Sequence, residues 1–131
     1  MSRFVLHAGA ALEVVRLDVQ VSGEHQLLAP TLMRSQTLSM LHEAVARGEV
    51  PADVARNHLA RVGRLPVRLL GDAVLRRRAW ELADRLGWSS TYDAEYAALA
   101  QLQADALITT DQTLARSLAD IVPTATVDAL T

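Results

Sequence analysis

The chain has 131 residues, a formal net charge of −2 and 50% hydrophobic residues, which suffices for one domain with a buried core and is too little for two ordinary domains. We therefore predict a single domain over residues 1–131. No apolar run approaches the ~20 residues of a membrane-spanning helix, and the N-terminus lacks the long apolar region of a signal peptide, so we expect a cytoplasmic protein without a membrane partner. The absence of cysteine excludes disulfides, thiolate metal sites and cysteine nucleophiles.

All thirteen basic residues are arginine, and lysine is absent. Without lysine the chain cannot be a P-loop NTPase or a phosphate-transfer receiver, both of which need one. Arginine suits bidentate phosphate contacts, but a GC-rich genome would give the same composition. Because the net charge is negative, any affinity for nucleic acid has to come from a local patch.

Short apolar runs alternate with helical patterns along the whole chain. The runs predict strands over residues 3–7, 26–29, 65–70, 106–108 and 125–127. Apolar residues at helical spacing, with Pro or Gly at the ends, predict helices over residues 8–15, 31–47, 51–62, 72–86 and 112–118, and a further helix that begins near residue 91.

This alternation predicts an α/β fold, a three-layer α/β/α domain with a small parallel sheet of four or five strands. The helices at 31–47 and 51–62 follow each other with no strand between them. We predict that they form a helical arm, with Val54, Leu59 and Val62 facing inward.

Two acids stand where an α/β fold can hold a ligand. Asp93 lies at the start of the helix near residue 91, and Asp111 follows the strand at 106–108. Ligands of such folds bind outside the carboxyl ends of the strands. Each acid also has a structural interpretation, since Ser90 could cap its helix together with Asp93, and Asp111 could cap the helix that follows it.

The helix predicted over residues 72–86 and the residues just after it carry both charge and aromatic side chains. Three consecutive arginines, Arg76 to Arg78, fan around the helix; a solvated face is the first interpretation, and contact with RNA phosphate or an acidic partner is the second. Trp80 lies within this helix and Trp88 just beyond it, and we assign both to core packing or an interface rather than to base stacking. Glu95 is expected to be solvated.

The segments APTLMRSQTLSML and STYDAEYAALAQLQADALITTDQTLAR, after a strand that ends near residue 7, resemble the PIN domain and in particular the VapC toxins of bacterial toxin–antitoxin pairs. The resemblance extends over nearly the whole chain in element order. It is most specific between Ser90 and Arg116, where the family reads roughly s-x-Y-D-A-x-Y-x-A-L-A and then L-x-T-x-D-x-x-L-A.

The resemblance implies a metal-dependent endoribonuclease, in which four acidic residues hold Mg²⁺ or Mn²⁺ for cleavage of an RNA phosphodiester. Asp93 matches the third acid and Asp111 the fourth, both in catalytic and metal-binding roles, with Thr109 in the supporting threonine position. The first acid is replaced by His7 and the second by Gln36.

Both replacements remove negative charge, and imidazole is a poor ligand for so hard an ion as Mg²⁺. We expect weakened magnesium binding, or a transition metal such as Mn²⁺ or Zn²⁺, or no metal. For His7 a second interpretation is open: a neutral imidazole hydrogen-bonded to Asp93 or Asp111 in a metal-free pocket.

Three hypotheses follow. The first is a VapC-type ribonuclease with weak activity or altered metal preference, and the second is an inactive PIN-fold module that binds an antitoxin or RNA. The third is an unrelated small-molecule binder, which no glycine-rich nucleotide loop supports. The resemblance also implies a VapB-like antitoxin, an RNA substrate and a homodimer. Apolar residues around Leu38, Leu41 and Val45, or the helix that begins at Pro51, would contribute to the dimer surface.

Overall fold

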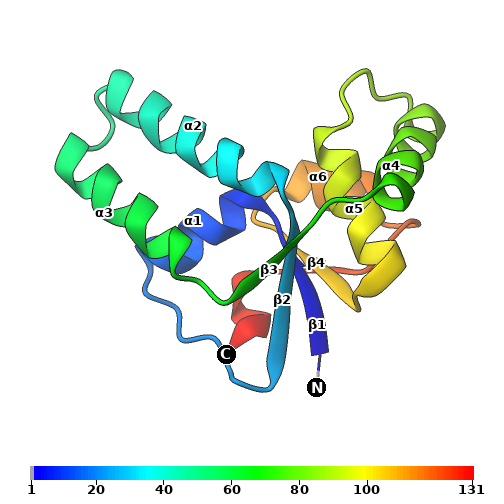
Figure 1. Cartoon of the computed structure of the whole chain (residues 1–131), viewed down its shortest axis with the longest axis horizontal. Coiled ribbons are helices and arrows are strands. Elements are labelled where there is room, and N and C mark those ends of the chain that lie inside the picture. Colours follow the sequence, from blue (N-terminus) through cyan, green and yellow to red (C-terminus); the bar gives the residue numbers. More distant parts are fainter. Residues whose placement is uncertain (1) are drawn as a thin grey trace.

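The computed structural model describes residues 2–131 and has a five-stranded, fully parallel sheet at its centre (Figure 1). The strand order is β3-β2-β1-β4-β5. The strands are β1 (Ser2–Leu6), β2 (His25–Pro30), β3 (Val67–Leu70), β4 (Ala106–Ile108) and β5 (Thr124–Ala125). The predicted α/β class with four or five parallel strands is thus confirmed.

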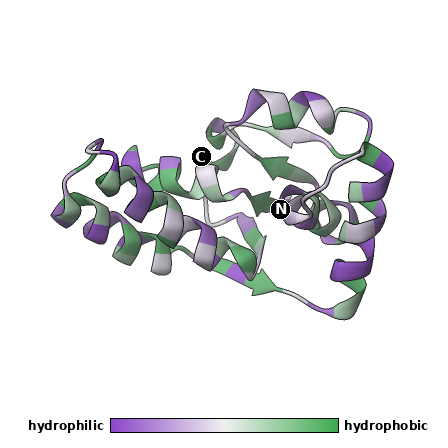
Figure 2. Cartoon of the chain, turned by 90° about the horizontal axis from the view of Figure 1, so that it is seen from above, coloured by the Kyte–Doolittle hydropathy of each residue, from purple (hydrophilic) through white to green (hydrophobic). Residues whose placement is uncertain are grey.

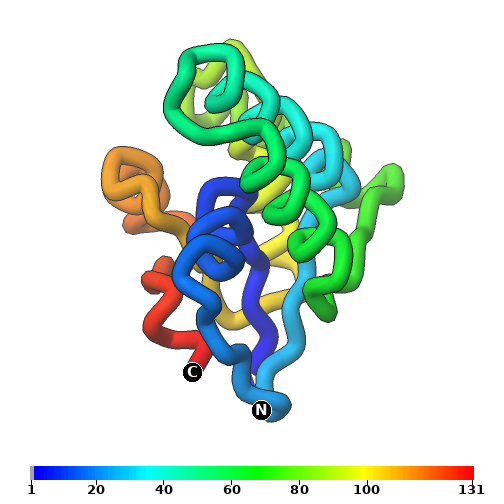
Figure 3. Tube along the Cα trace, turned by 90° about the vertical axis from the view of Figure 1, so that its left-hand side faces the viewer, coloured from blue at the N-terminus to red at the C-terminus, as the bar shows by residue number. Residues whose placement is uncertain are grey.

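Helices cover both faces of this sheet. They are α1 (Ala8–Arg16), α2 (Leu32–Ala46), α3 (Ala52–Gly63), α4 (Ala73–Leu86), α5 (Tyr92–Gln103) and α6 (Gln112–Ser117), followed by the 3-10 helix η1 (Val127–Leu130). Helix α5 packs on β1, β2 and β4 and carries α4 on its outer side, whereas α1 contacts α2, α3 and η1. In Figure 3, α1 lies in front of the strands and α5 behind them, which gives the three layers.

The order of the strands creates a reversal point between β1 and β4. From β1 the chain proceeds outward through β2 to β3, and it then returns across the sheet to β4. Right-handed crossovers place the helices of these two paths on opposite faces. The carboxyl ends of β1 and β4 at this reversal point are the usual ligand position in such sheets.

Helices α2 and α3 form the predicted arm, which projects to one side of the sheet (Figures 1 and 2). Gly48 ends the first helix with φ +74, a left-handed conformation that favours glycine. The inward residues of α3 are Ala55 and Val62, whereas Val54 is exposed. The prediction for Val54 was wrong because the buried stripe begins one position later, at Ala55.

The core is built mainly from the central strands and α5. Its fully buried side chains include Val5, Leu6, Leu107, Ile108 and Leu99. Trp80, by contrast, is 67% exposed on α4 and does not belong to the core. Within residues 2–131, no helix combines the length and the apolar character that crossing a bilayer requires.

Candidate functional site

His7 stands at the carboxyl end of β1, immediately before α1. Its backbone N–H donates to the carbonyl of Ile108 at 3.0 Å, which ties the end of β1 to β4. Its Nε2 lies 2.9 Å from Oδ1 of Asp93, with 15% of the histidine side chain and 44% of the aspartate side chain exposed. Because a carboxylate only accepts, Nε2 carries a proton. The second ring nitrogen, Nδ1, is buried and has no hydrogen-bond partner among residues 2–131.

Tyr96 connects this pair to Gln36. Its hydroxyl donates to Oε1 of Gln36 at 2.7 Å, and its ring packs edge-on against that of His7 with centroids 4.7 Å apart. Burial raises the pKa of Tyr96, and the charges of Asp93 and Glu95 raise it further, so the phenol remains a donor. We refer to His7, Asp93, Tyr96 and Gln36 as the His7 cluster.

The sequence interpretation did not identify Tyr96 as a site residue. It follows Asp93 by three positions, on the apolar side of α5 among alanines and leucine, and is fully buried. Positions three apart lie on the same side of a helix. A lone tyrosine within an alanine-rich buried face therefore offered a signal, because its hydroxyl needs a polar partner.

Asp93 reaches His7 because it is not engaged in capping its own helix. Thr91 is the N-cap residue of α5 and makes no side-chain cap, while the Ser90 hydroxyl accepts from the N–H of Tyr92 at 3.3 Å. The expected pairing of a Ser90 cap with Asp93 is thus absent. Glu95 is half-buried rather than solvated, and this burial raises its pKa, an effect that the charge of Arg76 opposes.

Asp111 lies between β4 and α6 and makes its hydrogen bonds locally. Its Oδ1 accepts from the N–H of Leu114 at 3.0 Å, the N-cap contact of α6, and its own N–H donates to Oγ1 of Thr109 at 3.0 Å. It lines a hollow of about 290 Å³ together with Thr109 and Arg116. A hydrogen bond joins His7 to Asp93, and Tyr96 links Gln36 to this pair, whereas within the described range 2–131 Asp111 makes no hydrogen bond to these residues.

The arrangement does not fit an ordinary Mg²⁺ site. Among residues 2–131, no three His, Cys, Asp or Glu side chains come close enough together to hold a metal ion. The oxygen of Gln36 already accepts from Tyr96, and Asp93 accepts from His7. Mg²⁺ requires octahedral oxygen ligands at about 2.1 Å, and Oδ1 of Asp93 and Oε1 of Gln36 each already accept a hydrogen bond within the cluster.

Comparisons with known proteins give matches at the level of structure alone. No family model matches the chain, and neither does any curated protein. A crystal structure of PAE2754 from Pyrobaculum aerophilum is similar, with 24% identity, a TM-score of 0.77, and coverage of 98% of this chain and 92% of that one.

Two further similar structures come from VapBC pairs. One is VapBC2 from Rickettsia felis bound to a DNA fragment from their promoter, with 9% identity, a TM-score of 0.66 and coverage of 95% of this chain and 98% of that one. The other is VapBC-1 from nontypeable Haemophilus influenzae, with 14% identity, a TM-score of 0.62 and coverage of 95% and 97%. At such identities the likeness concerns the fold, and it confirms the predicted PIN-type fold.

Proposed function

We propose that this PIN-fold chain is a VapC-like ribonuclease whose magnesium-dependent chemistry is impaired, and that it is paired with a VapB-like antitoxin. The observation that carries the proposal is the His7 cluster, which occupies the carboxyl edge of the sheet where the fold offers a ligand site. In that cluster, two positions where the family resemblance implies acids hold His7 and Gln36 instead.

The replacements act through charge and through occupied donor atoms. A site with two carboxylates attracts a divalent cation less strongly than a site with four, and the interaction grows steeply as the local dielectric constant falls. Asp93 is further engaged by His7 at 2.9 Å. Weak cleavage in magnesium, or a preference for Mn²⁺ or another transition metal that accepts imidazole, follows from this donor set.

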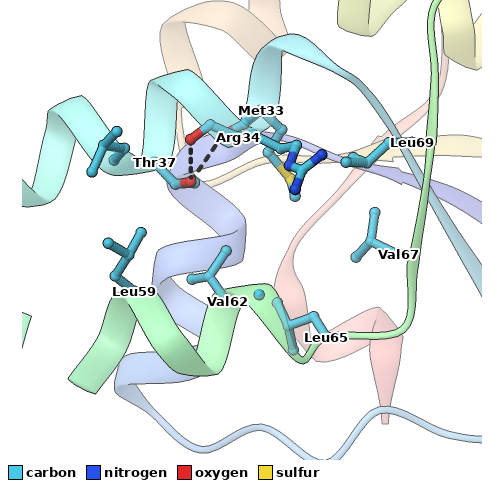
Figure 4. Close-up of a pocket in the computed structure, with 10 residues that line it drawn as sticks. Met33, Arg34, Thr37, Leu59, Val62, Leu65, Val67 and Leu69 are labelled. Atoms are coloured by element: carbon cyan, nitrogen blue, oxygen red, sulfur yellow. Dashed lines mark hydrogen bonds between the residues drawn. The ribbon is translucent and has the colours of Figure 1, made fainter. Parts of the chain in front are cut away.

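Antitoxin binding is supported by an apolar groove between α2, α3 and β3. Figure 4 shows its side chains facing a common space. The volume of this groove is about 640 Å³. Its apolar lining includes Met33, Leu59, Val62, Leu65, Val67 and Leu69. Arg34 also lines the groove, is exposed, and makes no ion pair with any residue in the described range 2–131.

An apolar groove with an unpaired arginine suits an apolar segment that carries a carboxylate. Two of the similar structures are VapBC structures, which favours an antitoxin segment as the occupant. This groove is also the basis of the second candidate function, an inactive module that retains antitoxin or RNA binding.

Leu38, 52% exposed on the arm, would contribute to a homodimer, which light scattering at micromolar concentration would detect.

Restoring the two acids tests the proposal. The double variant His7→Asp with Gln36→Glu should gain a magnesium-dependent rise in melting temperature, because a ligand that binds only the folded state stabilises it. RNA cleavage in magnesium should rise by about tenfold or more over the parent, and each single reversion should do less, since the charges act on one ion. Gln36→Glu retains an acceptor for the Tyr96 hydroxyl, so the fold should be preserved.

The matched control adds Asp93→Asn to the double variant and should abolish both gains. Cleavage by the parent as fast as by the double variant would contradict an impaired site. If neither protein binds metal nor cleaves RNA, the inactive binding module becomes the better account.

A further inference from the structure

A hollow of about 510 Å³ opens directly beside the His7 cluster, within the ~300–1,000 Å³ of typical ligand sites. The loop between α4 and α5 and the first turn of α5 supply most of its lining. Its lining is Gln36, Gly87, Trp88, Ser89, Ser90, Tyr92 and Asp93. Two aromatic rings and two serine hydroxyls thus share one open hollow with two members of the His7 cluster.

The side chain of Tyr92 presents an exposed aromatic ring to this hollow. It precedes Tyr96 by one helical turn, so both project from the same side of α5. Tyr96 is fully buried and hydrogen-bonded, whereas Tyr92 is 56% exposed. Within residues 2–131, the Tyr92 ring pairs with no other aromatic ring and its hydroxyl makes no hydrogen bond. An exposed aromatic ring next to a candidate site is available for stacking.

Trp88 is held at the opposite end of the loop. Gly87, with φ +72, ends α4 in the left-handed conformation, and the N–H of Trp88 then donates to the carbonyl of Ala83 at 2.8 Å. The ring is half-buried against the core and also lines the hollow. Our assignment of Trp88 to core packing therefore describes only one side of this ring.

We propose that this hollow binds an unpaired nucleobase of single-stranded RNA, stacked on Tyr92 and bounded by Trp88. This inference rests on the proposed function, because it places the base of an RNA whose backbone passes Asp93 and His7. Every base has a π-face that can stack, and the serine hydroxyls and the Gln36 amide supply polar contacts for its edge. A duplex base cannot enter, since only an unstacked base reaches such a hollow.

The chain's two tryptophans permit a direct test by fluorescence. Trp80→Phe leaves Trp88 as the sole emitter, and Trp88→Phe leaves Trp80, which is exposed on α4 and does not line the hollow. A short single-stranded RNA is added with a chelator, so that it is bound without being cleaved. It should quench the tryptophan fluorescence of the first variant and leave the fluorescence of the second unchanged. Equal quenching of both, or of neither, would overturn the proposal.

Affinity provides the second measurement. Tyr92→Ala should weaken binding of the same RNA on the order of tenfold, as loss of one stacking partner does. Tyr92→Phe keeps the ring and should bind like the parent, and duplex RNA should bind much more weakly than the single strand. If the parent binds RNA and Tyr92→Ala binds equally well, the hollow is not the base site, although the proposed function stands. If the parent binds no RNA, both proposals fall.

Discussion

Asp93 and Asp111 are the same residue type, each near the start of a helix, yet the structure engages them in different ways. Asp111 accepts from the N–H of Leu114, three residues along the chain. Asp93 bonds to His7, which is 86 positions away. One acid stabilises its own helix, and the other fastens α5 to the end of β1.

The difference indicates that a carboxylate near a helix start can bond to a distant residue when it does not cap its own helix. Asp111 occupies the N-cap position of α6, where a backbone N–H is always within reach. Asp93 lies within the first turn of α5, where its oxygen competes for no cap and can turn toward the neighbouring strand. The contact between Asp93 and His7 depends on the packing of Tyr96 against His7, so changes at Tyr96 should disrupt it.

Tyr96→Ala should have the largest effect. Removing a fully buried ring that packs on His7 should lower the free energy of unfolding by about 3–5 kcal/mol, because a cavity remains in the core. Tyr96→Phe removes only the hydrogen bond to Gln36 and should cost about 0.5–1.5 kcal/mol. Urea denaturation would measure both, and equal losses in the two variants would show that the hydrogen bond, not the ring, holds the cluster together.

Asp111→Ala should have an intermediate effect confined to α6. Loss of the N-cap should lower the free energy of unfolding by about 0.5–2 kcal/mol, whereas Asp111→Asn should be nearly neutral, because asparagine caps equally well. Thermal unfolding of the two variants would distinguish capping from a need for charge. A large loss in Asp111→Asn would mean that the negative charge itself serves the fold.

Asp93→Asn should have the smallest effect on stability. The side chain is 44% exposed, and partly exposed ion pairs or hydrogen bonds contribute about 0–1 kcal/mol. We expect the melting temperature to change by only a few degrees or less, since ~1 kcal/mol corresponds to roughly 4 °C in a domain of this size. A much larger fall in melting temperature would show that the contact with His7 stabilises the fold, and that Asp93 is not kept available for a ligand.

The sequence by itself determined the local features of this protein. Hydrophobic periodicity predicted the α/β alternation, and glycine and proline positions predicted the helix ends within a few residues, because these signals depend on near neighbours. The capping role open to Asp111 was visible for the same reason. The strand predicted from Leu65 begins only at Val67, since strand ends depend on pairing with β2, which no local signal specifies.

Tertiary structure alone decided what the site residues touch. The hydrogen bond between His7 and Asp93 and the contacts of Tyr96 with His7 and Gln36 join segments far apart in the chain. The reversal of strand order at β1 and β4 brings these segments to one edge, and the packing of α5 then selects which side chains meet there. A sequence pattern records which donors are present, whereas the distances between them follow from the packing of the sheet and helices.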